Sequence, residues 1–253
     1  MITRRLQVIG ALVFGVGLAF GPTAASAAET QVAVAANFTE PAKEIAQAFK
    51  AATGHTATLS FGSSGQFYSQ MAHGAPYEVF LSADADRPLK AEQDGLGVTG
   101  TRFTYAIGRL ALYSKTPGLV DPGGAVLASG KFQKLAMADP LQAPYGVAAT
   151  QTLRKLGVYN SVRSKLVLGS SLTQTYQFVS TGAADLGFVA YSQVIKEPGG
   201  SRWLVPTSFH APIEQQAILL YPGASNPAAK AFLSFLRSPA AISIIKSYGY
   251  EVR

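Results

Sequence analysis

Four short turns in this sequence combine small and polar residues in a way that suits the binding of an anion. They are Ala36-Asn37, Ser63-Ser64, Pro144-Tyr145-Gly146 and Ser171-Leu172. Each turn stands between a short apolar run and a segment with helical periodicity, so each is expected to open a helix at the end of a strand. A helix N-terminus presents unpaired backbone N–H groups and a partial positive charge. Any one of these turns is an ordinary helix cap, but four of them without a basic side chain predict a shared anion site.

Signals for catalysis are weak by comparison. The stretch Gly62-Ser63-Ser64-Gly65 is one residue short of a G-x-S-x-G nucleophile elbow, and no base stands at a recognisable spacing from Ser64. Asp84 and Asp86 are interpreted as the start of a helix rather than as an acid–base pair. The histidines are far apart in the sequence and form no metal-ligand spacing: His55, His73 and His210. We therefore expect a binding protein without a cofactor rather than an enzyme.

The first 27 residues have the pattern of an export signal. Arg4 and Arg5 precede an apolar run over residues 8–20, and Ala25-Ser26-Ala27 forms a small-residue cleavage site. The apolar run is shorter than the roughly 20 residues of a membrane-spanning helix. Residues 1–27 are therefore predicted to be a signal peptide that is removed on export to the periplasm.

The amino-acid composition and net charge limit the classes of partner that are expected for this protein. The net charge of +7 is spread along the chain without a Lys/Arg run, which argues against nucleic acid as a partner. The same modest positive charge favours encounter with small anions. The chain contains no cysteine, so neither a disulfide nor a lipid anchor on a cysteine is expected. With 48% apolar residues the chain has the material to fold by core burial alone.

Strands and helices are expected to alternate around these turns, which predicts parallel sheets covered by helices on both faces. In the first part of the chain, the pattern predicts strands at residues 31–36, 56–61 and 78–82, with helices from Thr39 and over 66–72. In the second part, it predicts strands at 135–138, 166–168 and 185–190, with helices over 147–156 and 172–180.

Two longer apolar runs, residues 105–114 and 215–221, are candidates for a pair of crossing strands. If the chain leaves one lobe near residue 108 and returns near 218, lobe I contains residues 28–108 plus 219–253, and lobe II contains residues 109–218. The expected fold is α/β and two-lobed, each lobe having a mixed, mainly parallel sheet flanked by helices.

At the four turns the chain resembles the periplasmic molybdate-binding proteins of bacterial ABC-type molybdate importers. The stretch G-A-P-x-[DE]-x-F-x-S-A-D, found here at residues 74–84, is the most specific element of the resemblance. The other matching segments are residues 34–39, 61–67, 138–140, 143–146, 186–190 and 248–250.

The resemblance implies a type II periplasmic-binding-protein fold that holds molybdate, and also tungstate, in a cleft between the lobes. It also implies an inner-membrane ABC permease as partner and a monomeric protein. Carried over by position, the candidate ligand-binding residues are Asn37, Ser64, Tyr145 and Leu172, the last through its backbone N–H. Four further candidates stand at the same strand ends: Ala36, Ser63, Ala190 and Tyr191.

The chemistry of molybdate agrees with such a site, because molybdate is a dianion that carries no proton at neutral pH. A pocket made of hydrogen-bond donors alone suits it, whereas phosphate brings a proton that needs an acceptor. The only metal expected is therefore molybdenum, as the bound oxyanion.

Three alternatives remain open from the sequence. Sulfate is also unprotonated, so the hydrogen-bond pattern does not separate it from molybdate. A ferric-ion binder would take its phenolate ligands from Tyr105, Tyr145 and Tyr191. A hydrolase would use Ser64, for which the sequence shows no base.

Overall fold

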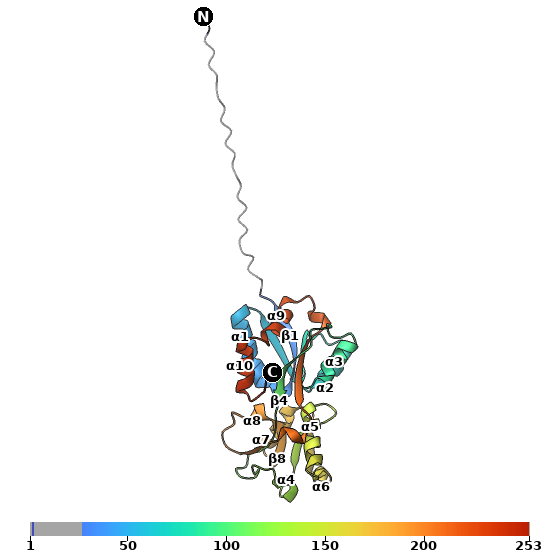
Figure 1. Cartoon of the computed structure of the whole chain (residues 1–253), viewed down its shortest axis with the longest axis vertical. Coiled ribbons are helices and arrows are strands. Elements are labelled where there is room, and N and C mark those ends of the chain that lie inside the picture. Colours follow the sequence, from blue (N-terminus) through green and yellow to red (C-terminus); the bar gives the residue numbers. More distant parts are fainter. Residues whose placement is uncertain (1, 3–26, 253) are drawn as a thin grey trace.

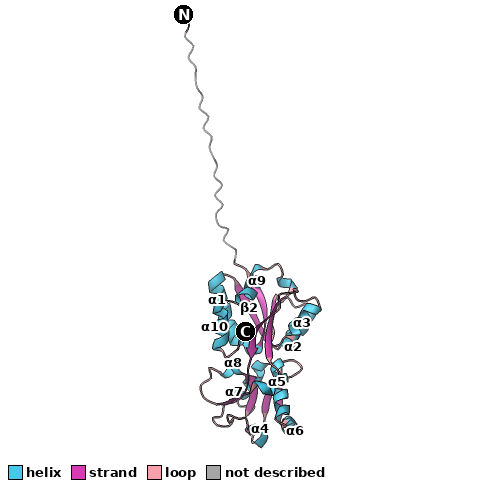
Figure 2. Ribbon diagram, in the orientation of Figure 1, coloured by secondary structure: helices cyan, strands magenta, loops and turns pink. Residues whose placement is uncertain are grey.

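The computed structural model describes Ile2 and residues 27–252, so the predicted signal peptide lies outside the described residues except at its second and last positions. The described residues form two five-stranded sheets, which lie one beyond the other along the long axis of the molecule (Figure 1). Helices flank both sheets (Figure 2). The predicted two-lobed α/β architecture is therefore confirmed.

The first sheet, with its helices, is called lobe I. Its strand order is β2-β1-β3-β10-β4, in which β1 is parallel to β2 and β3, and β10 is antiparallel to β3 and β4. The strands are β1 (Glu29–Ala35), β2 (Thr56–Gly62), β3 (Val79–Leu81), β4 (Phe103–Gly108) and β10 (Ile213–Leu219).

The second sheet, with its helices, is called lobe II and repeats the pattern. Its strand order is β7-β6-β8-β5-β9, in which β6 is parallel to β7 and β8, and β5 is antiparallel to β8 and β9. The strands are β5 (Leu110–Ser114), β6 (Leu135–Ala138), β7 (Leu166–Gly169), β8 (Leu186–Ala190) and β9 (Ser201–Leu204).

Helices cover both faces of the lobe I sheet, because successive side chains of a strand point to opposite faces. In β1, Val32 and Val34 pack with the helices of one face, and Ala33 packs with those of the other. The first group consists of α1 (Thr39–Thr53), α9 (Pro227–Phe235) and α10 (Pro239–Ser247), and the second of α2 (Ser64–Ala72) and α3 (Asp86–Gln93) (Figure 1).

Lobe II has the same layered construction. Leu110 and Leu112 of β5 pack toward α5, whereas Ala111 and Tyr113 pack toward α7. The helices are α4 (Val126–Ser129), α5 (Pro144–Lys155), α6 (Tyr159–Val162), α7 (Leu172–Ser180) and α8 (Tyr191–Val194), and the short 3-10 turns of the whole chain are η1 (Ala36–Phe38), η2 (Arg163–Lys165), η3 (Thr207–Phe209) and η4 (Tyr221–Gly223).

The chain crosses between the lobes at two places, one of which differs from the expectation. The predicted run 105–114 is divided at Arg109, so that β4 lies in lobe I and β5 in lobe II. The second run does not cross, because β10 pairs along its whole length with β3 and β4. Residues 213–218 therefore belong to the lobe I sheet rather than to lobe II, and the return crossing precedes Ile213.

Thr39 is the first residue of α1, as predicted for the start of this helix, and it follows the 3-10 turn η1. Its hydroxyl donates to the Ala36 carbonyl at 2.9 Å, so the side chain closes the preceding turn. As a result, η1 rather than α1 follows the end of β1 directly.

No single helix among the described residues is long and apolar enough to cross a membrane. The pair α9 and α10, which is bent by 59°, meets the criteria of length and hydropathy only when the two helices are taken together.

Candidate functional site

A small cavity lies between the lobes, at the carboxyl ends of strands from both sheets. Its walls are η1 and the first turn of α2 from lobe I, and the first turns of α5 and α7 from lobe II. The cavity volume is about 10 Å³, whereas pockets for metabolite-sized ligands measure roughly 300–1,000 Å³. The lining residues are Ala35, Ala36, Asn37, Gly62, Ser63, Ser64, Ala83, Ala143, Pro144, Tyr145 and Leu172.

The sequence-predicted residues fall into two groups. The structure brings Asn37, Ser64, Tyr145 and Leu172 together around the cavity, with Ala36 and Ser63 beside them. Ala190 and Tyr191 do not line it. The residues in the wall are all uncharged, as the sequence predicted for an anion site without a basic side chain.

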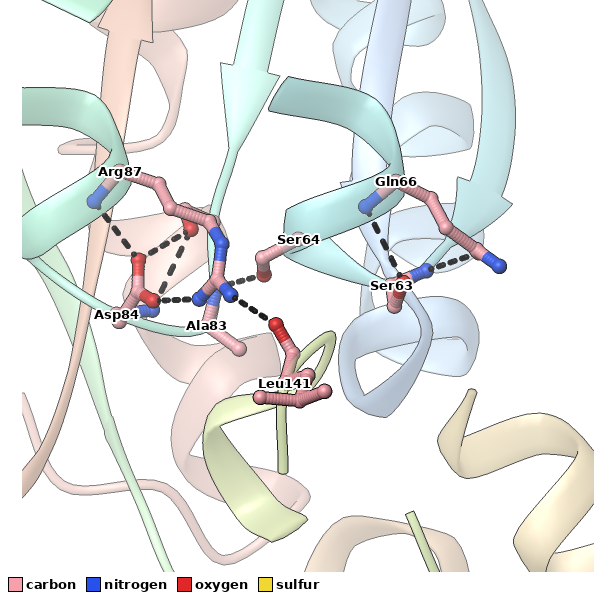
Figure 3. A network of polar contacts seen from close by, with 8 residues as sticks. Ser63, Ser64, Gln66, Ala83, Asp84, Arg87 and Leu141 are labelled. Atoms are coloured by element: carbon pink, nitrogen blue, oxygen red, sulfur yellow. Dashed lines mark hydrogen bonds and ion pairs between the residues drawn. The ribbon is translucent and has the colours of Figure 1, made fainter. Parts of the chain in front are cut away.

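Ser63 and Ser64 are placed by the start of α2 (Figure 3). Ser63 is the N-cap: its Oγ accepts from the Gln66 N–H at 3.3 Å, and the Gln66 side chain accepts from the Ser63 N–H in return. The Oγ of Ser64 accepts from the Ala83 N–H at 2.9 Å. Because both oxygens act as acceptors in these bonds, both hydroxyl protons remain available to a guest in the cavity.

The acidic residues next to this wall are structural, as the sequence analysis expected. Asp84 accepts from the Ser82 hydroxyl at 2.8 Å and from the Arg87 N–H at 3.2 Å, at the start of α3. It also forms an ion pair with the Arg87 guanidinium, which donates in addition to the Leu141 carbonyl of lobe II (Figure 3). The arginine charge is thus compensated by a carboxylate outside the lining of the cavity.

The side-chain amide of Asn37 makes its hydrogen bonds within the protein. Its Nδ2 donates to the Gln215 Oε1 at 2.7 Å and to the Tyr250 hydroxyl at 3.0 Å. Both amide protons are therefore used within the protein. The backbone N–H of Asn37 lies in the first turn of η1, where a helical turn leaves its N–H groups without partners of its own.

Tyr145 stands at the second position of α5. Pro144 occupies the first position and has no N–H, so Tyr145 carries the first backbone donor of this helix. Its hydroxyl accepts from the Gln215 Nε2 at 3.2 Å and lies next to Tyr250. The hydroxyl is therefore directed at Gln215 and Tyr250, and the backbone N–H remains at the helix start.

Leu172 is the first residue of α7, and Ser171 is its N-cap, with Oγ accepting from the Gln174 N–H at 3.3 Å. Its backbone N–H is therefore one of the donors at a helix start. The Leu172 carbonyl accepts from the Gln193 Nε2 at 3.2 Å, which orients the turn.

Ala190 and Tyr191 lie behind this turn rather than at the cavity. The Ala190 N–H donates to the Gln193 Oε1 at 3.0 Å. Tyr191 begins α8, and its N–H donates to the Arg109 carbonyl at 2.9 Å. Its ring lies so close to Gly249 that a Cβ there would be 2.7 Å from the ring. Tyr191 therefore supports the junction of the lobes, whereas the Ala190 contact stays within lobe II.

A buried polar network lies directly behind the cavity, and it includes residues that the sequence analysis did not single out as site residues. Gln215 is fully buried and Tyr250 nearly so, at 0% and 4% exposed. A buried side-chain amide must find partners, so the polar stretch Glu214-Gln215-Gln216 at the start of a strand was a usable signal. The members of this network are Asn37, Tyr105, Tyr145, Ser192, Gln215 and Tyr250.

Burial keeps the phenols of this network protonated. It raises the pKa of Tyr105 and Tyr145 well above the ordinary value, and that of Tyr250 to about 12. A ferric site would need phenolates, and Tyr191, the third tyrosine considered for an iron site, forms none of the hydrogen bonds of this network. Among the described residues, no group of three or more His, Cys, Asp or Glu side chains is placed to hold a metal ion.

The arrangement is suited to one kind of guest. Three helices of nine or more residues direct their N-terminal ends at one cavity, and each end carries a partial positive charge. The available groups are backbone N–H donors and two serine hydroxyls. A small anion that accepts hydrogen bonds on all sides fits this set of donors.

Comparisons with known proteins agree with this geometry. The family model described as "Bacterial extracellular solute-binding protein" matches residues 30–251. The molybdate-binding protein ModA of Rhodobacter capsulatus is 55% identical over 240 residues, which covers 95% of this chain and 93% of that protein. The corresponding protein of Azotobacter vinelandii is 52% identical over 245 residues, with coverages of 96% and 97%.

A solved structure supports the same assignment at the level of the fold. The Azotobacter vinelandii periplasmic molybdate-binding protein superposes with a TM-score of 0.86 at 41% identity, covering 88% of this chain and 99% of that chain. This likeness confirms the expected type II periplasmic-binding-protein fold. Because the matches span nearly the whole chain, the protein belongs to the bacterial extracellular solute-binding proteins and, within them, to the family of the periplasmic molybdate-binding proteins.

Proposed function

We propose that this protein captures molybdate, and also tungstate, in the cavity between its lobes and delivers it to an inner-membrane ABC importer. The observation that carries the proposal is the convergence of helix N-termini from both lobes on one cavity with an uncharged lining. The high identity to two molybdate-binding proteins supports molybdate over other tetrahedral anions.

The energetics of such a site are favourable without a cationic side chain. A charge-assisted hydrogen bond contributes about 1.5–3 kcal/mol. The donors proposed are the hydroxyls of Ser63 and Ser64 and the backbone N–H groups of Asn37, Tyr145 and Leu172. Together they offset a desolvation cost of several kcal/mol for a buried ion. A neutral pocket also releases its anion more readily than an arginine clamp would, which suits transfer to a transporter.

The setting proposed for this activity follows from the sequence. Residues 1–27 direct export and are removed, and the remaining chain acts in the periplasm as a monomer. It needs no cofactor, binds no nucleic acid and performs no catalysis. For the last point, the support is that Ser64, the one candidate nucleophile, is hydrogen-bonded to a backbone N–H rather than to a base.

Calorimetric titration of the chain from residue 28 tests the ligand class. Molybdate and tungstate are expected to bind with submicromolar Kd, and phosphate and Fe³⁺ are expected to give no heat of binding. Sulfate matches molybdate in charge and shape, so it is the critical comparison. Binding of sulfate as tight as that of molybdate, or no binding of either ion, would overturn the proposal.

A second titration tests the site. Ser64→Ala removes a hydroxyl donor, so the Kd for molybdate is expected to rise roughly tenfold to a hundredfold. The matched control is Ser161→Ala, which removes a hydroxyl that donates to the Val158 carbonyl in α6, away from the cavity. Equal Kd values for Ser64→Ala and the wild type would show that the anion does not contact this wall.

A further inference from the structure

The side chain of Gln215 connects the two walls of the cavity. Its Oε1 accepts from the Asn37 Nδ2 at 2.7 Å and from the Tyr105 hydroxyl at 3.1 Å, both in lobe I. Its Nε2 donates to the Tyr145 hydroxyl at 3.2 Å, in lobe II. Asn37 and Tyr145 themselves line the cavity from opposite lobes. One fully buried amide therefore links a wall residue of each lobe.

The backbone brings Gln215 to this position through an irregularity in the sheet. Gln215 pairs with Ala106, but the next residue, Gln216, pairs with Thr104, so Tyr105 is an extra residue in β4. At a β-bulge two residues of one strand oppose one residue of the other. Tyr105 and Ala106 thus both face Gln215, which explains how the Tyr105 hydroxyl reaches the amide.

Each end of the Gln215 amide has its own partners in the hydrogen-bond network. The Oε1 accepts from the Asn37 Nδ2 and from the Tyr105 hydroxyl. The Nε2 donates to the Tyr145 hydroxyl oxygen, and Tyr145 lies next to Tyr250, a further member of the network. Each group in this chain of bonds has a defined role, so the loss of one leaves a buried partner unsatisfied.

Gly108 provides the space for the bond between the lobes. A Cβ at this position would lie 2.1 Å from the Tyr145 hydroxyl and 2.6 Å from the Gln215 Nε2. Gly108 ends β4, and the next residue, Arg109, is the crossing between the lobes. Any side chain at Gly108 would therefore separate the two groups that join the lobes.

We propose that Gln215 is a positioning residue for ligand capture, which holds the walls of lobe I and lobe II in the closed arrangement that surrounds the anion. The inference rests on the proposed function, because it concerns the same cavity. Gln215 does not line the cavity and acts through Asn37 and Tyr145. Closed lobes must separate before the anion leaves, so the bonds of Gln215 slow release of the ligand more than they affect its entry.

The variant Gln215→Met tests this role, because methionine has a similar volume but makes none of these bonds. The matched control is Gln216→Met. Gln216 is the adjacent glutamine of the same strand, and it bonds only within lobe I, to Thr104 and Arg102. Isotopically labelled molybdate, chased with excess unlabelled molybdate, gives the release rate. We expect release roughly tenfold faster or more for Gln215→Met and unchanged for Gln216→Met.

A second pair of variants reaches the same bond without altering Gln215. Gly108→Ala places a methyl group between Gln215 and Tyr145, and is expected to speed release as Gln215→Met does. Its control is Gly123→Ala, where the nearest atom to an added Cβ, on Asp121, is 3.4 Å away. If Gln215→Met does not fold, this pair and Tyr145→Phe decide the question by the same release assay.

The outcomes separate this inference from the proposed function. If the wild type binds no molybdate, the proposed function fails. If the wild type binds molybdate but Gln215→Met and Gly108→Ala release it at the rate of their controls, the positioning role is wrong. A merely structural role would lower the melting temperature of both glutamine variants and leave the release rate unchanged.

Discussion

The phenols behind the cavity illustrate how burial sets the properties of single residues in this protein. Tyr250 is 4% exposed and hydrogen-bonds to the Asn37 carbonyl at 2.8 Å and to Ser192 at 2.9 Å. Its pKa is raised to about 12, chiefly because burial disfavours the phenolate. Side-chain hydrogen bonds with Ser192 and with the Asn37 amide, whose Nδ2 donates to the phenol oxygen, lower this pKa but do not cancel the effect of burial.

This shift predicts a loss of stability at alkaline pH. In the unfolded chain a tyrosine loses its proton near pH 10, whereas folded Tyr250 keeps it until about pH 12. The stabilisation is complete below pH 10 and is lost as the pH rises through this window, by about 1.4 kcal/mol per pH unit for one tyrosine. Urea unfolding at several alkaline pH values should therefore show a shallower decline for Tyr250→Phe than for the wild type. An identical decline in the two proteins would contradict the assignment.

For single residues, the sequence predicted positions at the cavity better than it predicted hydrogen-bond partners. Ser63, Ser64, Tyr145 and Leu172 were placed at the cavity because turns at strand ends meet in an α/β fold. The use of each group was less predictable: the Asn37 amide turns inward to Gln215, a partner 178 positions away in the sequence. Local patterns do not contain such partners, which only the assembled sheet brings together.

At the scale of elements, the candidate site is formed mainly by the first turns of helices. The first turn of α5 begins at Ala143, an N-cap in extended conformation whose side chain makes no cap hydrogen bond. Ser63 and Ser171 supply cap bonds at α2 and α7, each through its own Oγ. Pro144 has no N–H, and the Gly146 N–H donates to the Ala143 carbonyl at 2.9 Å, so the Tyr145 N–H is the group at the α5 start that is open to an outside acceptor.

A carboxylate introduced at the N-terminus of α5 is expected to occupy the place of the anion and so to weaken anion binding. Ala143→Asp introduces a favourable N-cap, which contributes about 1 kcal/mol to helix stability, and puts a negative charge where the anion is proposed to bind. We expect molybdate affinity to fall more than a hundredfold, while the free protein unfolds at or above the wild-type temperature. Ala143→Asn is the control, because asparagine caps as well without the charge and should bind molybdate much more tightly than the aspartate variant. Equal affinities in calorimetry would exclude an anion at this helix end.

Most elements around the site were predictable, and the exceptions have physical reasons. Capped, periodic helices such as α7, expected at residues 172–180, were found at the expected place. Strand β9 (Ser201–Leu204) was missed because a four-residue edge strand with Arg202 inside it has little periodicity. The run 105–114 read as one strand because its apolar pattern continues through the crossing at Arg109, where the two sheets meet. Apolar periodicity reports burial, and both β4 and β5 are buried.

At the scale of the whole molecule, several contacts join the lobes around the cavity. The Gly65 N–H donates to the Gln142 carbonyl at 3.0 Å, and the Arg87 guanidinium donates to the Leu141 carbonyl at 3.2 Å. On the other side, the Ser192 hydroxyl donates to the Asn37 carbonyl at 2.8 Å. Bonds between the lobes thus flank the cavity on both sides, so a guest there would contact two sheets that the described residues connect at two crossings.

A ligand bound in this way should protect both lobes at once. A ligand that binds only the folded state stabilises it by about 2.7 kcal/mol at a concentration of 100 times Kd. Because the proposed donors come from α2 in lobe I and from α5 and α7 in lobe II, the first turns of all three helices should exchange their amide hydrogens more slowly with molybdate present. Hydrogen-exchange mass spectrometry measures this, with phosphate at the same concentration as control. Protection confined to one lobe would mean that the anion rests on a single wall, and that the second lobe does not take part in holding it.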